Sequence, residues 1–150
     1  MNESNHKAAE MHNLAAHAHR VAAAHHASQD HLSGRERSTQ ALEHSNQAFL
    51  HAQEQHRHAE PEGRALAESA PSVVSTEPAI SDQENRTMPT EAHKTAAAHH
   101  DKAAESHRKA ALQFCSGAGD DCREITETAL GESAKAHAAS IVAERKSAAV

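Results

Sequence analysis

Apolar residues, most of them alanine, recur every three or four positions over most of the chain, and polar residues fill the positions between them. This spacing matches the 3.6-residue period of an amphipathic α-helix. It predicts helices over about 4–30, 34–60, 90–115 and 122–148. All four prolines fall within 61–89, so we expect that segment to be a long connection between two helical halves.

Capping signatures mark the starts of the second and fourth helices. Ser33 is followed three residues later by Glu36, and Asp121 by Glu124, which is the spacing of a capping box. Each half is therefore expected to form a helical hairpin with a glycine-containing turn. Two hairpins and a long connection predict an all-α fold, an antiparallel four-helix bundle. The single domain, 1–150, would consist of hairpin 4–60, connection 61–89 and hairpin 90–148.

The two halves are related in sequence. A shift of 88 residues aligns 8–57 with 96–145 without a gap. Identical residues at aligned positions include His12/His100, His19/His107, Arg20/Arg108, Leu42/Leu130 and Ser45/Ser133. Because the match continues through the predicted turns, we interpret the chain as an internal duplication.

The chain has 16 histidines, and histidine is the residue type most suited to form a functional site in this sequence. Three series repeat at seven-residue intervals, close to two helical turns: His12, His19, His26; His44, His51, His58; and His93, His100, His107. On a helical projection the first and third series lie in the middle of the alanine stripe, and the second lies to one side of its stripe. The first and third series are therefore expected to point into the bundle.

Buried imidazoles suggest a metal-binding interior, because neutral imidazole is a common metal ligand. The predicted ligands are His12, His19, His26, His44, His51, His56, His58, His93, His99, His100, His107 and His137. Imidazole favours copper, nickel, zinc or cobalt ions, and we expect several per chain. The simpler alternative is that these histidines are solvated surface residues or hydrogen-bonded core residues.

Two further expectations concern pairing. If the first two helices run antiparallel, their two series of histidines at seven-residue intervals would lie beside each other. This predicts three pairs at successive heights along the hairpin: His12/His58, His19/His51 and His26/His44. Cys115 and Cys122 flank the second turn, where they would form a disulfide or thiol pair, or bind metal at the bundle end.

The composition limits the classes of molecule that this protein can bind. The formal charge of −6 and the near absence of aromatic residues exclude a basic or stacking surface for nucleic acid. No apolar run approaches a membrane span and the N-terminus lacks a signal core, so we expect a cytoplasmic protein without a membrane partner. An alanine-lined core buries little apolar area, so assembly into a homo-oligomer or a bound ligand would add stability.

The plan resembles the bacterial copper storage proteins, four-helix bundles whose interiors hold many cuprous ions through cysteine thiolates. Their closely spaced cysteine motifs are absent here, so the resemblance implies only a ligand-lined bundle. Paired Glu-x-x-His motifs, His-Glu-x-x-His and phosphate-binding loops are also absent, so we expect no enzyme. The leading hypothesis is metal storage or buffering. The alternatives are a structural or stress-related interaction protein with pH-sensing histidines, and a metallochaperone.

Overall fold

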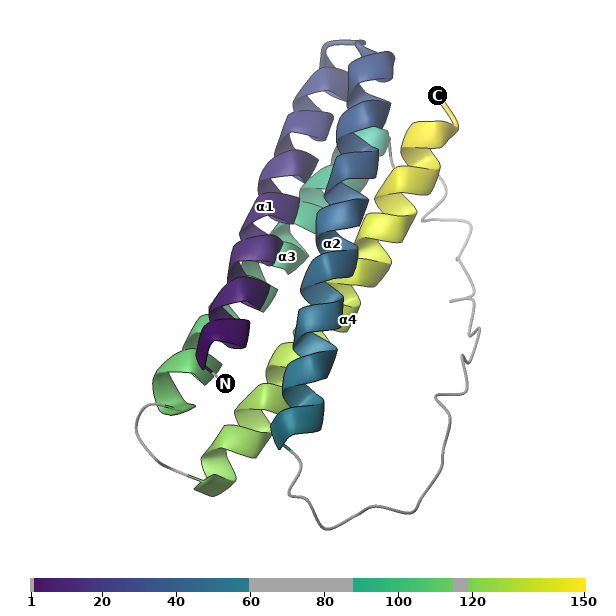
Figure 1. Ribbon diagram of the computed structural model, residues 1–150. Coiled ribbons are helices and arrows are strands. Elements are labelled where there is room, and N and C mark those ends of the chain that lie inside the picture. The colour runs from purple at the N-terminus through teal and green to yellow at the C-terminus, as the bar shows by residue number, and fades with distance from the viewer. Residues whose placement is uncertain (1, 60–87, 115–118) are drawn as a thin grey trace, which may run out of the picture.

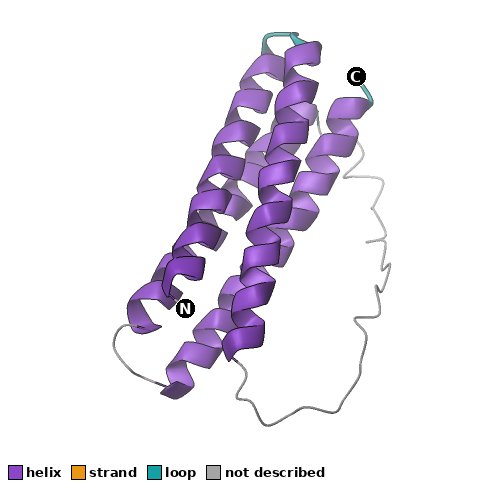
Figure 2. Cartoon of the chain, viewed as in Figure 1, coloured by secondary structure: helices purple, strands orange, loops and turns teal. Residues whose placement is uncertain are grey.

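The computed structural model describes residues 2–59, 88–114 and 119–150, and these ranges contain four α-helices and no strand (Figures 1 and 2). The helices are α1 (Asn2–Ala27), α2 (His31–Ala59), α3 (Pro89–Phe114) and α4 (Gly119–Ala148). The predicted all-α fold is therefore confirmed. Most of the predicted connection, 60–87, lies outside the described residues.

The helices pack as a four-membered bundle in which α1 contacts α2 and α3, and α4 contacts the same two helices. α1 and α4 run in one direction and α2 and α3 in the other, so every neighbouring pair is antiparallel (Figure 1). α1 and α4 face each other diagonally across the interior. None of the helices in the described ranges is long and apolar enough to cross a membrane.

The first turn lies about three residues earlier than the sequence predicted. Asp30 caps α2, because its Oδ1 accepts a hydrogen bond from the Ser33 backbone N–H at 3.2 Å. Gln29 takes a left-handed conformation with φ of 64° to close the turn. Ser33 is therefore inside α2, and the predicted Ser33 cap is wrong. α4 likewise begins at Gly119, ahead of Asp121.

Alanine forms the apolar part of the core. Every buried hydrophobic side chain in the described residues is an alanine, whereas the largest fully buried side chains are histidines. Small side chains let the helices approach closely, and the imidazole rings fill the remaining interior. Histidine thus has the space-filling role that leucine or phenylalanine has in most bundles.

Contacts between α1 and α3 repeat with the same 88-residue shift that relates the two halves. Arg20 of α1 pairs with Asp101 of α3. The shifted positions are Arg108 of α3 and Asn13 of α1, and Arg108 donates a hydrogen bond to Asn13 Oδ1 at 2.9 Å. The repeat therefore extends from sequence to side-chain contacts.

Two glycines offer a matched test of this packing. Gly131 is exposed on α4, and a Cβ there meets nothing within 4 Å. We expect Gly131→Ala to stabilise the fold by about 1 kcal/mol, because alanine is the better helix former. A Cβ at Gly34 would lie 2.7–2.9 Å from three atoms of the His26 ring. That ring is also held by Ser147 at 2.7 Å.

We expect Gly34→Ala to destabilise the fold by about 1–3 kcal/mol, because the ring must be displaced from its hydrogen bonds. Chemical denaturation of both variants measures the difference. Equal changes in the free energy of unfolding would contradict the packing of His26 on Gly34.

Candidate metal centre

Seven imidazole rings form one continuous column through the bundle. Six are buried and come from α1 and α3, and the seventh, at the start of α2, is half-buried. Successive ring centroids lie between 5.1 and 5.5 Å apart. In spatial order the column runs His107, His12, His100, His19, His93, His26, His31. The first and third heptad series therefore meet on the bundle axis.

Neighbouring rings in this column are joined alternately in two ways. In the tilted pairs the two Nδ1 atoms face each other within hydrogen-bond distance, so one nitrogen donates to the other. These distances are 2.9 Å for His12–His100, 2.9 Å for His19–His93 and 3.1 Å for His26–His31. Each such pair has room for a single proton between its two nitrogens.

In the stacked pairs the two rings share a serine hydroxyl from α4. Three serines at seven-residue spacing supply these hydroxyls, each 2.7–2.8 Å from two Nε2 atoms. Ser133 joins His12 and His107, Ser140 joins His19 and His100, and Ser147 joins His26 and His93. α4, which lacks buried histidines among its described residues, therefore completes the column with serine.

Two of these hydroxyls have a third neighbour. Ser133 Oγ lies 2.9 Å from the Ala129 carbonyl oxygen, and Ser140 Oγ lies 3.1 Å from that of Ala136. A hydroxyl carries one hydrogen and accepts through two lone pairs. Ser133 and Ser140 can therefore each donate either to an imidazole or to the backbone, and this choice fixes the tautomers of the two rings that each serine joins.

When each serine donates to an imidazole, the column is satisfied with every ring neutral. Each group then donates one hydrogen bond to the next and accepts one from the previous group. The order of donation is His31, His26, Ser147, His93, His19, Ser140, His100, His12, Ser133, His107 and finally Asn5. Asn5 Oδ1 accepts from His107 Nδ1 at 3.2 Å. The buried imidazoles therefore leave no nitrogen without a partner.

Burial strongly disfavours protonation of this column. It lowers the pKa of His100 to about 2 and that of His12 to about 3, with the charge of neighbouring rings as the next cause. The same causes lower the pKa of His19 to about 3 and that of His93 to about 4, and burial alone lowers the pKa of His107 to about 4. No Asp or Glu is buried among the described residues to balance a positive charge.

The second histidine series lies outside the column. His44, His51 and His56 are half-buried on α2, and only the backbone of His58 is described. His99 and His137 are also half-buried, and the His137 ring stacks on Phe49 at 5.3 Å. The described side chains of this set share no hydrogen bond or ring contact with the six buried rings, although the charges of His99 and His137 contribute to lowering the pKa of His100.

Two of the three predicted pairs between the first two helices are wrong. His19 pairs with His93 of α3 and His26 pairs with His31, so neither contacts its expected partner on α2. His12 pairs with His100, and the side chain of its expected partner, His58, lies outside the described residues. Because the turn is centred near Gln29, the register between α1 and α2 differs from the predicted one by several residues.

The partners of the imidazoles were not predicted from the sequence. These residues are Asn5, His31, Ser133, Ser140 and Ser147. A signal existed in the seven-residue spacing of the serines, which equals that of the histidines. Cys115 and the side chain of Cys122 lie outside the described residues, so the alternatives for that pair stay predictions.

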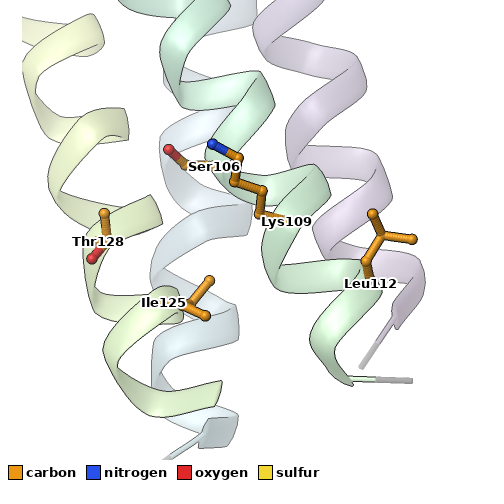
Figure 3. A pocket seen from close by; sticks show the side chains of 5 residues that line it. All are labelled: Ser106, Lys109, Leu112, Ile125 and Thr128. Atoms are coloured by element: carbon orange, nitrogen blue, oxygen red, sulfur yellow. The ribbon is translucent and has the colours of Figure 1, made fainter. Parts of the chain in front are cut away.

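Other metal-binding arrangements are not found in the described part of the chain. No cluster there brings together three or more His, Cys, Asp or Glu side chains in a way that could hold a metal ion. A surface hollow between α3 and α4 is lined by Ser106, Lys109, Leu112, Ile125 and Thr128 (Figure 3). None of these lining residues is a histidine, cysteine or carboxylate, so the imidazole column remains the candidate site.

Acid should unfold the bundle. The pKa values of the buried histidines are lower in the folded state than the value of 6.5 for the unfolded chain. Stability is therefore complete above pH 6.5 and is lost as the pH falls toward 4, because the unfolded state binds more protons. Each buried histidine lowers the free energy of unfolding by at most about 1.4 kcal/mol per pH unit. Several histidines together therefore lower it by more than a typical total stability within about two pH units.

Helicity followed by circular dichroism between pH 7.5 and 4 measures this loss. We expect a steep transition below pH 6. A flat signal down to pH 4 would contradict the burial of neutral imidazoles.

Removal of a shared hydroxyl should be costly. Ser140→Ala leaves the Nε2 atoms of His19 and His100 buried without their partner, so we expect a loss of about 2–4 kcal/mol in the free energy of unfolding. Ser106→Ala makes the same change on the half-exposed face of α3 and should cost less than about 0.5 kcal/mol. Urea denaturation of both variants gives the comparison, and equal losses would count against the network.

Comparison with known proteins gives no independent guide to function. The chain matches none of the protein-family models, curated proteins or solved structures with which it was compared. The imidazole column is therefore the feature from which a function can be proposed.

Proposed function

We propose that this bundle stores metal ions, each held between the facing Nδ1 atoms of an imidazole pair. The observation that carries the proposal is the set of Nδ1–Nδ1 contacts at 2.9–3.1 Å in the core. Three pairs are present: His12–His100, His19–His93 and His26–His31. Catalysis is not part of the proposal, because a buried pair leaves no position for a substrate.

The serines allow each inner pair to exchange its proton for an ion. If Ser133 and Ser140 donate to the carbonyl oxygens of Ala129 and Ala136, both can accept Nε2–H from two imidazoles. His12, His19, His100 and His107 are then Nε2–H tautomers, and His93 takes the same form when Ser147 donates to His26 Nε2. The two Nδ1 lone pairs of each inner pair, His12–His100 and His19–His93, then face each other. Lone pairs at this distance repel unless a cation lies between them.

This second arrangement has the form expected around a metal-binding histidine. Such histidines usually donate their other ring N–H to an oxygen that fixes the tautomer and orients the ring. Here the serine hydroxyl is that oxygen, and the backbone carbonyl orients the hydroxyl in turn. The proton leaves Nδ1 for Nε2 within the column, so loading at neutral pH should release no proton to solvent.

The number and charge of the ligands favour a monovalent ion. Each pair supplies two nitrogens, and no buried carboxylate among the described residues balances extra positive charge. Of the four metals expected from sequence, copper also exists as a monovalent ion that accepts two nitrogen ligands. Metal–nitrogen bonds of about 2.0–2.1 Å in a straight line need nitrogens about 4 Å apart. A pair at 2.9 Å would therefore open by about 1 Å.

Storage accounts for the repetition better than delivery does. Equivalent pairs recur at seven-residue steps along α1, about 10.5 Å apart. A metallochaperone needs one accessible site, whereas two of these pairs are fully buried. Repeated, equivalent and buried sites are what a store of several ions requires.

A second candidate function is that of a purely structural bundle. It is favoured by the directed hydrogen-bond arrangement, in which every buried imidazole of the column is satisfied without an ion. Buried polar networks of this kind can specify the register of a bundle. Ion stoichiometry separates the two functions, because a structural column has no reason to bind ions at its Nδ1 atoms.

The test is equilibrium dialysis followed by elemental analysis, with both cysteines replaced by serine to remove thiol ligands. We expect two or more ions per chain with Cu⁺ or Ag⁺ under anaerobic conditions, and fewer with Cu²⁺, Ni²⁺, Zn²⁺ and Co²⁺. His12→Gln/His100→Gln should lose one ion. The control His6→Gln/His17→Gln, on the exposed face of α1, should lose none of the buried ions.

Fewer than two ions per chain with every metal would exclude storage and favour the structural bundle. Loss of ions in the surface variant alone would show that binding occurs outside the column.

A further inference from the structure

We infer that Asn5 ends the column and limits its capacity, because it occupies the place of a fourth paired imidazole. This inference rests on the proposed function and concerns the number of ions that the column takes. Asn5 is fully buried on α1, and its Oδ1 lies 3.2 Å from His107 Nδ1. His107 is thus the one buried ring whose Nδ1 faces an amide instead of another imidazole.

The duplication identifies the missing ring. The 88-residue shift relates His12 to His100, so that pair maps onto itself. The same shift relates His19 to His107, and it relates Asn5 to His93. The pair His19–His93 therefore maps onto His107–Asn5, with asparagine where the other half has histidine.

The contact geometry supports this equivalence. The Nδ1–Nδ1 distance in the histidine pair is 2.9 Å, and the Oδ1–Nδ1 distance in the asparagine pair is 3.2 Å. On the surface, Arg20–Asp101 and Arg108–Asn13 are related by the same shift. The end of the column at Asn5 is therefore half of an ion site, with one nitrogen ligand from His107.

Asparagine also satisfies this end in both arrangements of the column. When the rings form the directed chain, Asn5 Oδ1 accepts the Nδ1–H of His107, and Asn5 Nδ2 is buried without a partner among the described residues. When Ser133 accepts from two imidazoles, His107 becomes the Nε2–H tautomer with a lone pair on Nδ1. Rotation of the amide by half a turn then lets Nδ2 donate to that lone pair.

The amide therefore acts as a positioning residue. It matches either tautomer of His107 without an ion, whereas a second imidazole would leave two lone pairs facing each other in the loaded arrangement. Asn5 closes the column at three pairs and keeps its last nitrogen satisfied as the inner pairs fill.

The experiment counts ions in a variant that restores the missing ring. In the cysteine-free chain, loaded with Ag⁺ as the probe, Asn5→His should bind one more ion than the parent chain binds. Asn13→His is the matched control, because it adds a histidine on the exposed face of the same helix. It should not change the number of buried ions, and circular dichroism should show equal helicity for all three chains.

A second readout uses the chain with its native Asn5. Nitrogen NMR of the His107 ring should show the proton on Nδ1 without metal and on Nε2 after Ag⁺ loading. Equal numbers of bound ions, two or more, in the parent and Asn5→His, or an unchanged His107 tautomer, would overturn the inference and leave the proposed function standing. Absence of Ag⁺ binding by the parent chain would overturn the proposed function and the inference together.

Discussion

The interior of this bundle depends on one constraint, which is that each hydrogen-bonded contact between neighbouring groups of the column holds one proton. Each facing Nδ1 pair accommodates one proton, and each serine hydroxyl has one hydrogen for as many as three neighbours. Neutral rings satisfy this count throughout, and an added positive charge has no buried carboxylate beside it in the described core. The same count underlies the expected sensitivity of these hydrogen bonds to acid and the proposed exchange of the proton in a pair for a cation.

The alanine core makes this network possible and also makes it necessary. Alanines at the helix contacts leave space near the axis that only larger side chains fill, and the described chain fills it with imidazoles. Because alanine contributes little apolar area, the positions of the core side chains depend more on the hydrogen bonds of the column than on apolar packing. Loss of one shared hydroxyl therefore affects rings on two helices at once, as at Ser140.

The sequence predicted the bundle and the inward direction of the α1 and α3 histidines, because helical period and the alanine stripe define which face is buried. It did not predict which rings meet. A projection gives the face of a helix but not the register between helices, and a turn displaced by three residues changes every pairing. The role of Ser140 was also missed, since serine on a buried face is usually satisfied by its own backbone.

The pair that the 88-residue shift maps onto itself, His12–His100, has a consequence for how such a protein can change. In a symmetric dimer of identical hairpins, His12 and His100 would be the same residue on two chains, and so would Asn5 and His93. Every substitution would then act on both ends of the column together. With both hairpins in one chain, the two halves are free to differ, and Asn5 in one half corresponds to His93 at the equivalent place in the other half. Joining the halves thus gives the column a direction that no symmetric assembly could have.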